Sequence, residues 1–275
     1  MIATEPTTTA QRQSRLDQYY ARHVMLDGKF CCGHFTECRA SHSGPYFEGQ
    51  AHYVGDHFDA KVDGVPMRIV VVGQEYGHGP ALTDATARAK MIQGSAHAPR
   101  GFADRNPHMK GTTHALRVLF GRTPGVDPAG ETLDVGRVQI HLFDAFALVN
   151  LLLCSATDGT ARGRATDTML SNCLHHFTSV MEVLQPTVLV CQGKGFFWYV
   201  AEALGVPKKK ESVFSFRCGG VDGFGVCLNH PSTPRWEWAW ANPAQPYLAA
   251  RVLPLLNEVR DRMGLGPVEG NGSTL

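Results

Sequence analysis

The segment that decides the fold is M-R-I-V-V-V-G-Q-E-Y-G-H-G, which spans residues 67–79. Its first seven residues, Met67–Gly73, form a nearly continuous apolar run, which is typical of a strand buried on both faces of a parallel sheet. The polar residues Gln74 and Glu75 follow the run directly. Because ligands of open parallel sheets bind beyond the carboxyl ends of the strands, this segment predicts a central strand that carries functional groups at its end.

Similar apolar runs recur along the rest of the chain and predict three more buried strands. These runs are Phe146–Leu152, Thr187–Gly193 and Gly223–Asn229. Between them, apolar residues at three- and four-residue steps predict helices over Thr112–Phe120, Asp167–Leu184, Phe196–Leu204 and Tyr247–Met263. The alternation of strands and helices predicts an α/β fold with a mostly parallel sheet. The irregular stretch Gly77–Asn106 is expected to be a long functional loop, with a tolerated surface insertion as the alternative.

Length and composition limit the classes of protein that this chain can belong to. With 275 residues and 43% hydrophobic content, the chain is expected to form a single domain over residues 1–275, with flexible ends at 1–10 and 266–275. The net charge of +1 makes any contact with nucleic acid local. The chain has no apolar run of membrane-spanning length and no signal-peptide pattern, so we expect a cytoplasmic monomer without a membrane partner. In that compartment the eight cysteines are expected to be metal ligands or buried thiols.

Three chemically complementary residues lie at the predicted strand ends. Glu75 follows the first strand, Asn150 lies near the end of the second, and His230 follows the fourth. Breaking a C–N glycosidic bond leaves positive charge on the sugar, which a carboxylate stabilises, and negative charge on the base, which a histidine stabilises. The Asn amide offers a donor and an acceptor to the edge of a base that has left the stack. The alternatives are that His230 caps a loop and that Asn150 is a buried structural amide.

Four short motifs, at residues 73–79, 107–111, 150–154 and 230–232, resemble in their order and spacing those of the uracil-DNA glycosylase superfamily, and the resemblance covers most of residues 30–260. The run G-Q-E-Y-G-H-G at 73–79 is similar to the water-activating loop G-Q-D-P-Y-H-G of cluster-free members and to the G-E-A-P-G loop of iron–sulfur members. His230-Pro231-Ser232 resembles the H-P-S motif of the last strand. Asn150-Leu-Leu-Leu-Cys154 and Pro107-His108-Met109-Lys110-Gly111 resemble the N-x-x-x-C and P-F-x-G-x-x-G segments of the iron–sulfur members.

This resemblance implies a fold, an activity and a role for each matching residue. The fold is a three-layer α/β/α sandwich with a central four-stranded, mostly parallel sheet. The activity is that of a monofunctional DNA glycosylase that hydrolyses the N-glycosidic bond of a flipped-out uracil or modified pyrimidine. Glu75 and His230 are the expected catalytic residues, with His230 beside the base O2 anion and Glu75 near the sugar and water. The expected substrate-binding residues are Gln74, Tyr76, Gly77, His108, Asn150, Ser232 and Arg235, with Ser232 and Arg235 on backbone phosphates.

The cysteines extend the resemblance to the iron–sulfur members. Eighteen residues separate Cys154 from Cys173, and Cys38 and either Cys32 or Cys31 lie upstream of the first strand. The resemblance implies a 4Fe-4S cluster held by Cys32, Cys38, Cys154 and Cys173, because thiolate sulfur matches iron. A zinc site is the alternative. Cys191 and Cys227 lie in apolar strand patterns and are expected to be buried free thiols.

Departures from the family pattern keep other functions open. Glu75 replaces the Asp or Ala of the relatives, Gly77 leaves the C5 side of a pyrimidine unobstructed, and His108 stands where a base-stacking Phe is usual. A glycosylase specific for a bulky C5-modified pyrimidine of phage DNA, acting in antiviral defence, is therefore an alternative. A non-catalytic DNA-binding module that retains the fold and cluster is a second. A nucleotide-handling enzyme is a third, but the chain lacks the G-x-x-x-x-G-K-[ST] phosphate loop.

Overall fold

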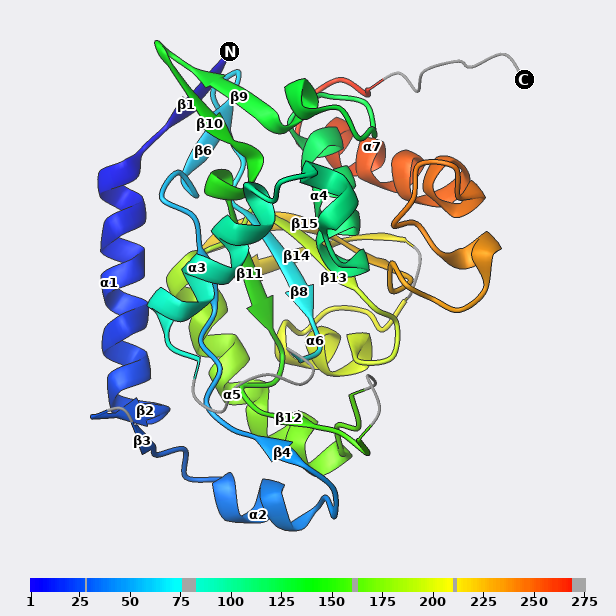
Figure 1. The fold of residues 1–275 in the computed structure, drawn as a ribbon. Coiled ribbons are helices and arrows are strands. Elements are labelled where there is room, and N and C mark those ends of the chain that lie inside the picture. Colours follow the sequence, from blue (N-terminus) through cyan, green and yellow to red (C-terminus); the bar gives the residue numbers. More distant parts are fainter. Residues whose placement is uncertain (28, 76–82, 160–162, 210–211, 269–275) are drawn as a thin grey trace.

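The computed structural model describes residues 1–27, 29–75, 83–159, 163–209 and 212–268. The described chain is mixed α/β, with both parallel and antiparallel strand pairs. A six-stranded sheet in the order β14-β15-β13-β8-β11-β5 lies at the centre (Figure 1). Its strands are β5 (Tyr53–Val54), β8 (Ile69–Gly73), β11 (Phe146–Asn150), β13 (Val188–Gln192), β14 (Val213–Cys218) and β15 (Val221–Leu228).

The four strands predicted from the apolar runs are the four inner strands of this sheet. β15, β13, β8 and β11 run parallel to one another. The predicted number of four strands was wrong for the sheet as a whole, because β14 and β5 add antiparallel edges. β14 alternates buried and exposed residues, as a sheet edge does, and β5 has only two residues.

Alternate residues of β8 enter two different hydrophobic cores. Ile69 and Val71 belong to one core, and Val70 and Val72 belong to the other. Side chains of α3 (Ala85–Ala96), α4 (Pro107–Leu119) and α7 (Leu253–Arg262) contribute to the first core. Those of α5 (Asp167–Leu184) and α6 (Phe197–Ala203) contribute to the second. The strand is therefore apolar throughout because helices cover both of its faces (Figure 1).

The helices agree with the predicted ones in the second half of the chain. They are α1 (Pro6–His23), α2 (Phe35–Ala40), α3 (Ala85–Ala96), α4 (Pro107–Leu119), α5 (Asp167–Leu184), α6 (Phe197–Ala203) and α7 (Leu253–Arg262). α5 has the predicted bounds, because the Thr166 side chain caps its first turn by accepting from the Met169 N–H at 3.2 Å. A π-helical turn, Leu248–Val252, leads directly into α7.

The N-terminal ten residues, which were predicted to be flexible, contain a strand and the first turns of a helix. β1 (Ile2–Thr4) pairs with β6 (Ala60–Val62) and β9 (Thr132–Val135) inside a second sheet of order β10-β9-β1-β6-β7. The other strands of that sheet are β7 (Val65–Pro66) and β10 (Val138–His141). α1 follows with Pro6 at its start and then places Arg12 against Asp59, at 3.1 Å between Nε and Oδ1. Most of the other predicted flexible end, 266–275, lies outside the described residues.

The predicted long loop 77–106 contains a helix, so that prediction was also wrong in part. The Asp84 carboxylate caps α3 by accepting from the Ala87 N–H at 2.7 Å, and Ile92 buries its side chain on the sheet side of the helix. α4 then begins at Pro107 rather than at Thr112, because the Asn106 side chain accepts from the Met109 N–H at 2.9 Å. His108 therefore lies in the first turn of a helix.

Candidate active site

A cavity of about 690 Å³ opens at the carboxyl ends of the four parallel strands. We call it the strand-end pocket. Each inner strand contributes to its wall: β8 through Gln74 and Glu75, β11 through Asn150, β13 through Gln192, and β15 through Asn229 and His230. The three residues singled out for glycosidic chemistry, Glu75, Asn150 and His230, thus line one pocket. A site at this edge is the usual one for an open parallel sheet.

Asn150 and His108 meet above the last residue of β8. A Cβ added to Gly73 would lie 2.8 Å from Asn150 Oδ1 and 3.1 Å from His108 Nε2. Glycine at position 73 therefore allows both side chains to approach the strand end closely. Gly111 has a similar role one turn further along α4, where an added Cβ would press on the Pro231 ring. Gly111 thus allows the P-H-M-K-G and H-P-S segments to pack closely together.

Gln192 fixes the orientation and the tautomer of His108. In the amide orientation that satisfies its neighbours, Gln192 donates to His108 Nε2 at 3.2 Å and accepts from the Thr112 N–H at 3.0 Å. His108 Nε2 is then an acceptor, so the neutral ring carries its proton on Nδ1. Burial, together with the nearby His230, lowers the pKa of His108 to about 3. The His108 ring is therefore uncharged at neutral pH.

His230 is held by its own loop in the opposite tautomer. The Ser232 N–H donates to His230 Nδ1 at 3.2 Å, and the Ser232 hydroxyl lies 2.8 Å from the same atom. Nδ1 therefore acts as an acceptor, which leaves the proton of the neutral ring on Nε2. Desolvation at the pocket wall lowers the pKa of His230 from its ordinary value. A neutral imidazole with an Nε2–H donor suits the stabilisation of an anion on a departing base.

Glu75 bridges the pocket to the segment that carries Cys154. Its carboxylate accepts from Gln74 Nε2 at 3.0 Å and from the Ala156 N–H at 3.1 Å. Burial raises the pKa of Glu75, although these hydrogen bonds oppose the rise. Gly163 packs directly against the carboxylate, and a Cβ at position 163 would overlap it. The carboxylate is thus positioned from several sides at the edge of the pocket.

The remaining predicted substrate-binding residues have different positions. Gln74, His108 and Ser232 line the strand-end pocket. Arg235 does not line it; its guanidinium stacks on the Trp238 ring, 4.6 Å from the centroid. Tyr76 and Gly77 lie outside the described residues.

Sequence reasoning missed the contribution of β13 to the site. Gln192, Gly193, Lys194 and Phe196 all line the strand-end pocket. Their signal was present in the sequence, because the third apolar run ends in Gln192-Gly193 and Lys194 follows it directly, as Gln74 follows the first run. The strand-end rule applied to all four strands identifies them.

The four predicted cluster cysteines line a second, apolar pocket, which we call the cysteine pocket. Cys38 comes from α2, Cys173 from α5, and Cys32 and Cys154 from the segments beside them. The other walls are mainly apolar and aromatic side chains, which are Phe30, Phe35, Tyr46, Leu153 and Met169. Cys31 is exposed and is not among the lining residues, so the geometry favours Cys32 over Cys31. Cys191 and Cys227 are fully buried elsewhere, as expected for structural thiols.

The four thiols of this second pocket are the ligand type of an iron–sulfur cluster, but in the structure they are not arranged as a formed metal site. Burial raises the pKa of Cys154 to about 12 and raises that of Cys38 and Cys32, so without metal these thiols are protonated. Four thiols around an apolar hollow match the ligand set of a cubane cluster. In the described part of the chain, no three His, Cys, Asp or Glu side chains form a group that could hold a metal ion.

Elements around the cysteine pocket connect the two halves of the chain. β12 (Ser155–Ala156) pairs with β4 (Tyr46–Phe47), which joins the Cys154 segment to the N-terminal cysteine segment. His176 of α5 contacts two residues of the N-terminal segment. Its Nε2 lies 3.4 Å from Cys32 Sγ, and its Nδ1 lies 2.7 Å from the Tyr19 hydroxyl. The short hairpin of β2 (Met25–Leu26) and β3 (Lys29–Phe30) precedes Cys31 and Cys32.

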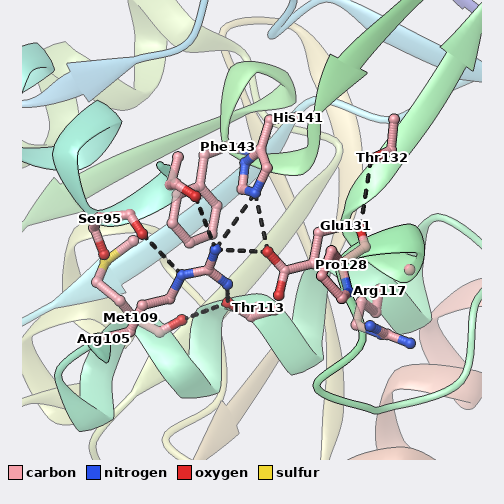
Figure 2. A network of polar contacts seen from close by, with 12 residues as sticks. Ser95, Arg105, Met109, Thr113, Arg117, Pro128, Glu131, Thr132, His141 and Phe143 are labelled. Atoms are coloured by element: carbon pink, nitrogen blue, oxygen red, sulfur yellow. Dashed lines mark hydrogen bonds and ion pairs between the residues drawn. The ribbon is translucent and has the colours of Figure 1, made fainter. Parts of the chain in front are cut away.

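α3 and α4 form one wall of the strand-end pocket. A buried polar network around Arg105 and Glu131 lies behind this wall, and Figure 2 shows the network. Arg105 donates to the Ser95 carbonyl at 3.0 Å, to Thr113 Oγ1 at 2.9 Å and to Glu131 Oε2 at 2.6 Å. His141 Nε2 lies 3.1 Å from the same Glu131 oxygen. Because Ser95 also lines the pocket, the network fixes the far end of the cavity.

Comparison of the chain with models of known protein families found no match, and a search among curated proteins also found no similar sequence. Among the helices that the structure describes, none is both long enough and apolar enough to span a bilayer.

Proposed function

We propose that this protein is a monofunctional DNA glycosylase that hydrolyses the N-glycosidic bond of an extruded pyrimidine. The observation that carries the proposal is that Glu75, Asn150 and His230, from three separate strand ends, line one pocket. The proposal includes the three-layer α/β/α sandwich of the uracil-DNA glycosylase superfamily as the fold. DNA is the proposed partner, and the protein is proposed to act as a monomer.

The proposed mechanism assigns a distinct role to each side chain. The base enters between His108 and Asn150, where the amide pairs with the pyrimidine edge and the uncharged imidazole stacks on the ring. As the C–N bond breaks, the His230 Nε2–H donates to the base oxygen that gains negative charge. Glu75 accepts a proton from the attacking water or stabilises the cationic sugar. The water oxygen bonds to the sugar C1′, and the proton that the water loses passes through Glu75 and solvent to the anionic base, so that a neutral base leaves and an abasic deoxyribose remains in the DNA.

The cysteine pocket is proposed to hold a 4Fe-4S cluster through Cys32, Cys38, Cys154 and Cys173. The cluster supplies a structural cross-link between α2, α5 and the segment after β11. All eight cysteines are free thiols in the structure, which supports a reducing compartment such as the cytoplasm. Metal analysis of anaerobically purified protein distinguishes this proposal, which predicts iron with acid-labile sulfide, from the zinc alternative.

The size of the strand-end pocket favours one alternative substrate class. Beyond Asn150 and His108 the cavity continues along α3, where Met91, Ile92 and Ser95 form its wall. This extension leaves room for a substituent larger than the methyl group of thymine. A glycosylase for a bulky C5-modified pyrimidine, such as a glucosylated hydroxymethyl base of phage DNA, is therefore the second candidate.

The test is mass spectrometry of bases released from matched duplexes by the wild type and by His230→Ala. The duplexes contain uracil, 5-hydroxymethyluracil, 5-hydroxymethylcytosine or glucosylated 5-hydroxymethylcytosine. Release of at least one base by the wild type, and much slower release by the variant, is the expected result. If the protein binds every duplex and releases nothing, excision is refuted and the non-catalytic DNA-binding module is favoured.

A further inference from the structure

A further cavity of about 590 Å³, distinct from the cysteine pocket, adjoins the strand-end pocket. We call it the flanking pocket. It shares Lys194 and Asn229 with the strand-end pocket, and the loop after β15 and the residues before α7 complete it. The side chains that line it include Lys194, Asn229, Trp238, Tyr247 and Arg251. A ligand that fills both cavities must therefore pass beside Lys194 and Asn229.

Asn229 connects the boundary between the cavities to both aromatic residues. Its Nδ2 donates to the Trp238 carbonyl at 3.1 Å, and its backbone N–H donates to the Tyr247 hydroxyl at 3.3 Å. Trp240, which is fully buried, donates from Nε1 to the Asn229 carbonyl at 2.7 Å. The loop that presents Trp238 is thereby attached to the end of β15. An exposed indole on such a rigid support loses little entropy when a ring stacks on it.

The chemistry of the flanking pocket suits a nucleotide. Trp238 is 47% exposed, and the Arg235 guanidinium stacks on its ring. Lys194 lies over the Tyr247 ring, with Nζ 5.9 Å from the centroid, and Arg251 lines the same cavity. Cations that outnumber the single acidic lining residue, Glu237, attract phosphate, and an exposed indole stacks on a base of any sequence.

We propose that the flanking pocket binds the nucleotide next to the one extruded into the strand-end pocket. Its base stacks on Trp238, and the phosphate that joins the two nucleotides lies beside Lys194, in the wall that the cavities share. This inference rests on the proposed DNA substrate. It adds that the site holds two adjacent nucleotides, with stacking but without sequence readout at the second.

The chain provides a matched control for Trp238. Trp236 lies two residues earlier in the same 3-10 turn and is 54% exposed, but it does not line the flanking pocket. Both tryptophans are surface residues, so both alanine variants are expected to fold. A general loss of aromatic surface affects the two variants alike, whereas loss of the subsite affects only Trp238→Ala.

The experiment is fluorescence anisotropy with short single-stranded oligonucleotides that carry a tetrahydrofuran abasic analogue at the extruded position. Two further probes carry an additional abasic analogue on the 5′ or the 3′ side of it. Stacking contributes about 1–3 kcal/mol per base, so Trp238→Ala is expected to weaken binding by about 5- to 150-fold, whereas Trp236→Ala is not.

The inference is tested by comparing the two variants with the wild type on each of the three probes. Removing the flanking base on one side should weaken binding of the wild type and of Trp236→Ala, but should not weaken binding of Trp238→Ala further. Equal affinity of Trp238→Ala and the wild type overturns the inference. The inference is also overturned if Trp238→Ala binds all three probes more weakly than the wild type by the same factor, because the loss then does not depend on a flanking base. Because the assay measures binding, a protein that releases no base can still confirm the subsite, and absence of DNA binding by the wild type refutes both proposals.

Discussion

Replacement of Arg105 by Met tests the buried network behind the strand-end pocket. The Arg105 side chain is 0% exposed and the Glu131 side chain only 6%. Desolvation alone would raise the pKa of Glu131, but the hydrogen bonds from His141 and Arg105 lower it below its ordinary value. Arg105→Met therefore leaves a buried carboxylate without its main cation, and Met keeps most of the packing of the side chain.

The expected loss of stability is large for one substitution. Removing one partner of a buried ion pair costs about 3–5 kcal/mol, because the other charge stays buried. With an unfolding entropy of about 2.1 cal/mol/K per residue, a chain of this length gains about 0.6 kcal/mol/K on unfolding. The melting temperature should therefore fall by about 5–9 °C. The double variant Arg105→Met/Glu131→Met should recover part of the loss, because it leaves no buried charge.

Thermal unfolding followed by circular dichroism measures this effect, with Arg100→Met as the control. Arg100 pairs with Asp104 four residues away, and its side chain is 78% exposed, so its loss should cost less than about 1 kcal/mol. Equal melting temperatures of Arg105→Met and Arg100→Met would refute the predicted importance of the buried ion pair. A double variant no more stable than Arg105→Met would show that the unpaired Glu131 carboxylate does not cause the loss of stability.

Three further predictions concern the site itself. Burial raises the pKa of Glu75 above its ordinary 4.5, so its ionised form is lost as pH falls through the raised pKa; base release should show an acid limb above pH 4.5 that disappears in Glu75→Gln, and an unchanged limb in that variant refutes the role. Gly163→Ala should slow release about 100-fold by displacing the Glu75 carboxylate, whereas Gly266→Ala, which has open space at its Cβ position and does not line the strand-end pocket, should not; similar rates of the two variants count against this positioning. Cys173→Ala should yield colourless protein, with absorption near 400 nm as the readout, and Cys191→Ala, whose thiol is buried away from the cysteine pocket, should keep the colour of the wild type.

The elements that sequence patterns predicted best are those whose pattern is local. The four inner strands were predicted because a strand covered on both faces must be apolar throughout, and α5 because its cap and its apolar stripe lie in one continuous segment. β5 and β12 have two residues each and exist only because a partner strand pairs with them, so no local pattern indicates them. The Asp84 cap of α3 was present in the sequence, but a stretch rich in Gly, Ala and His obscured it.

The sequence allowed us to predict which residues line the candidate site, but not the tautomers and hydrogen bonds that these residues adopt. The strand-end rule brings Glu75, Asn150 and His230 to one edge, and the structure places them around one pocket. The opposite tautomers of His108 and His230 depend on Gln192 and on the Ser232 N–H, and these contacts exist only after folding. The same holds for the contact of His176 with Cys32 across 144 positions of sequence.

Single-turnover base release by the wild type, Asn150→Ala and His230→Ala tests the central claim most directly. With DNA binding measured in parallel and the protein at saturating concentration, each variant is predicted to release the base from bound DNA about 10²- to 10³-fold more slowly than the wild type. Wild-type rates in either variant would contradict the claim that a carboxamide and an imidazole from separate strands act on one extruded nucleotide.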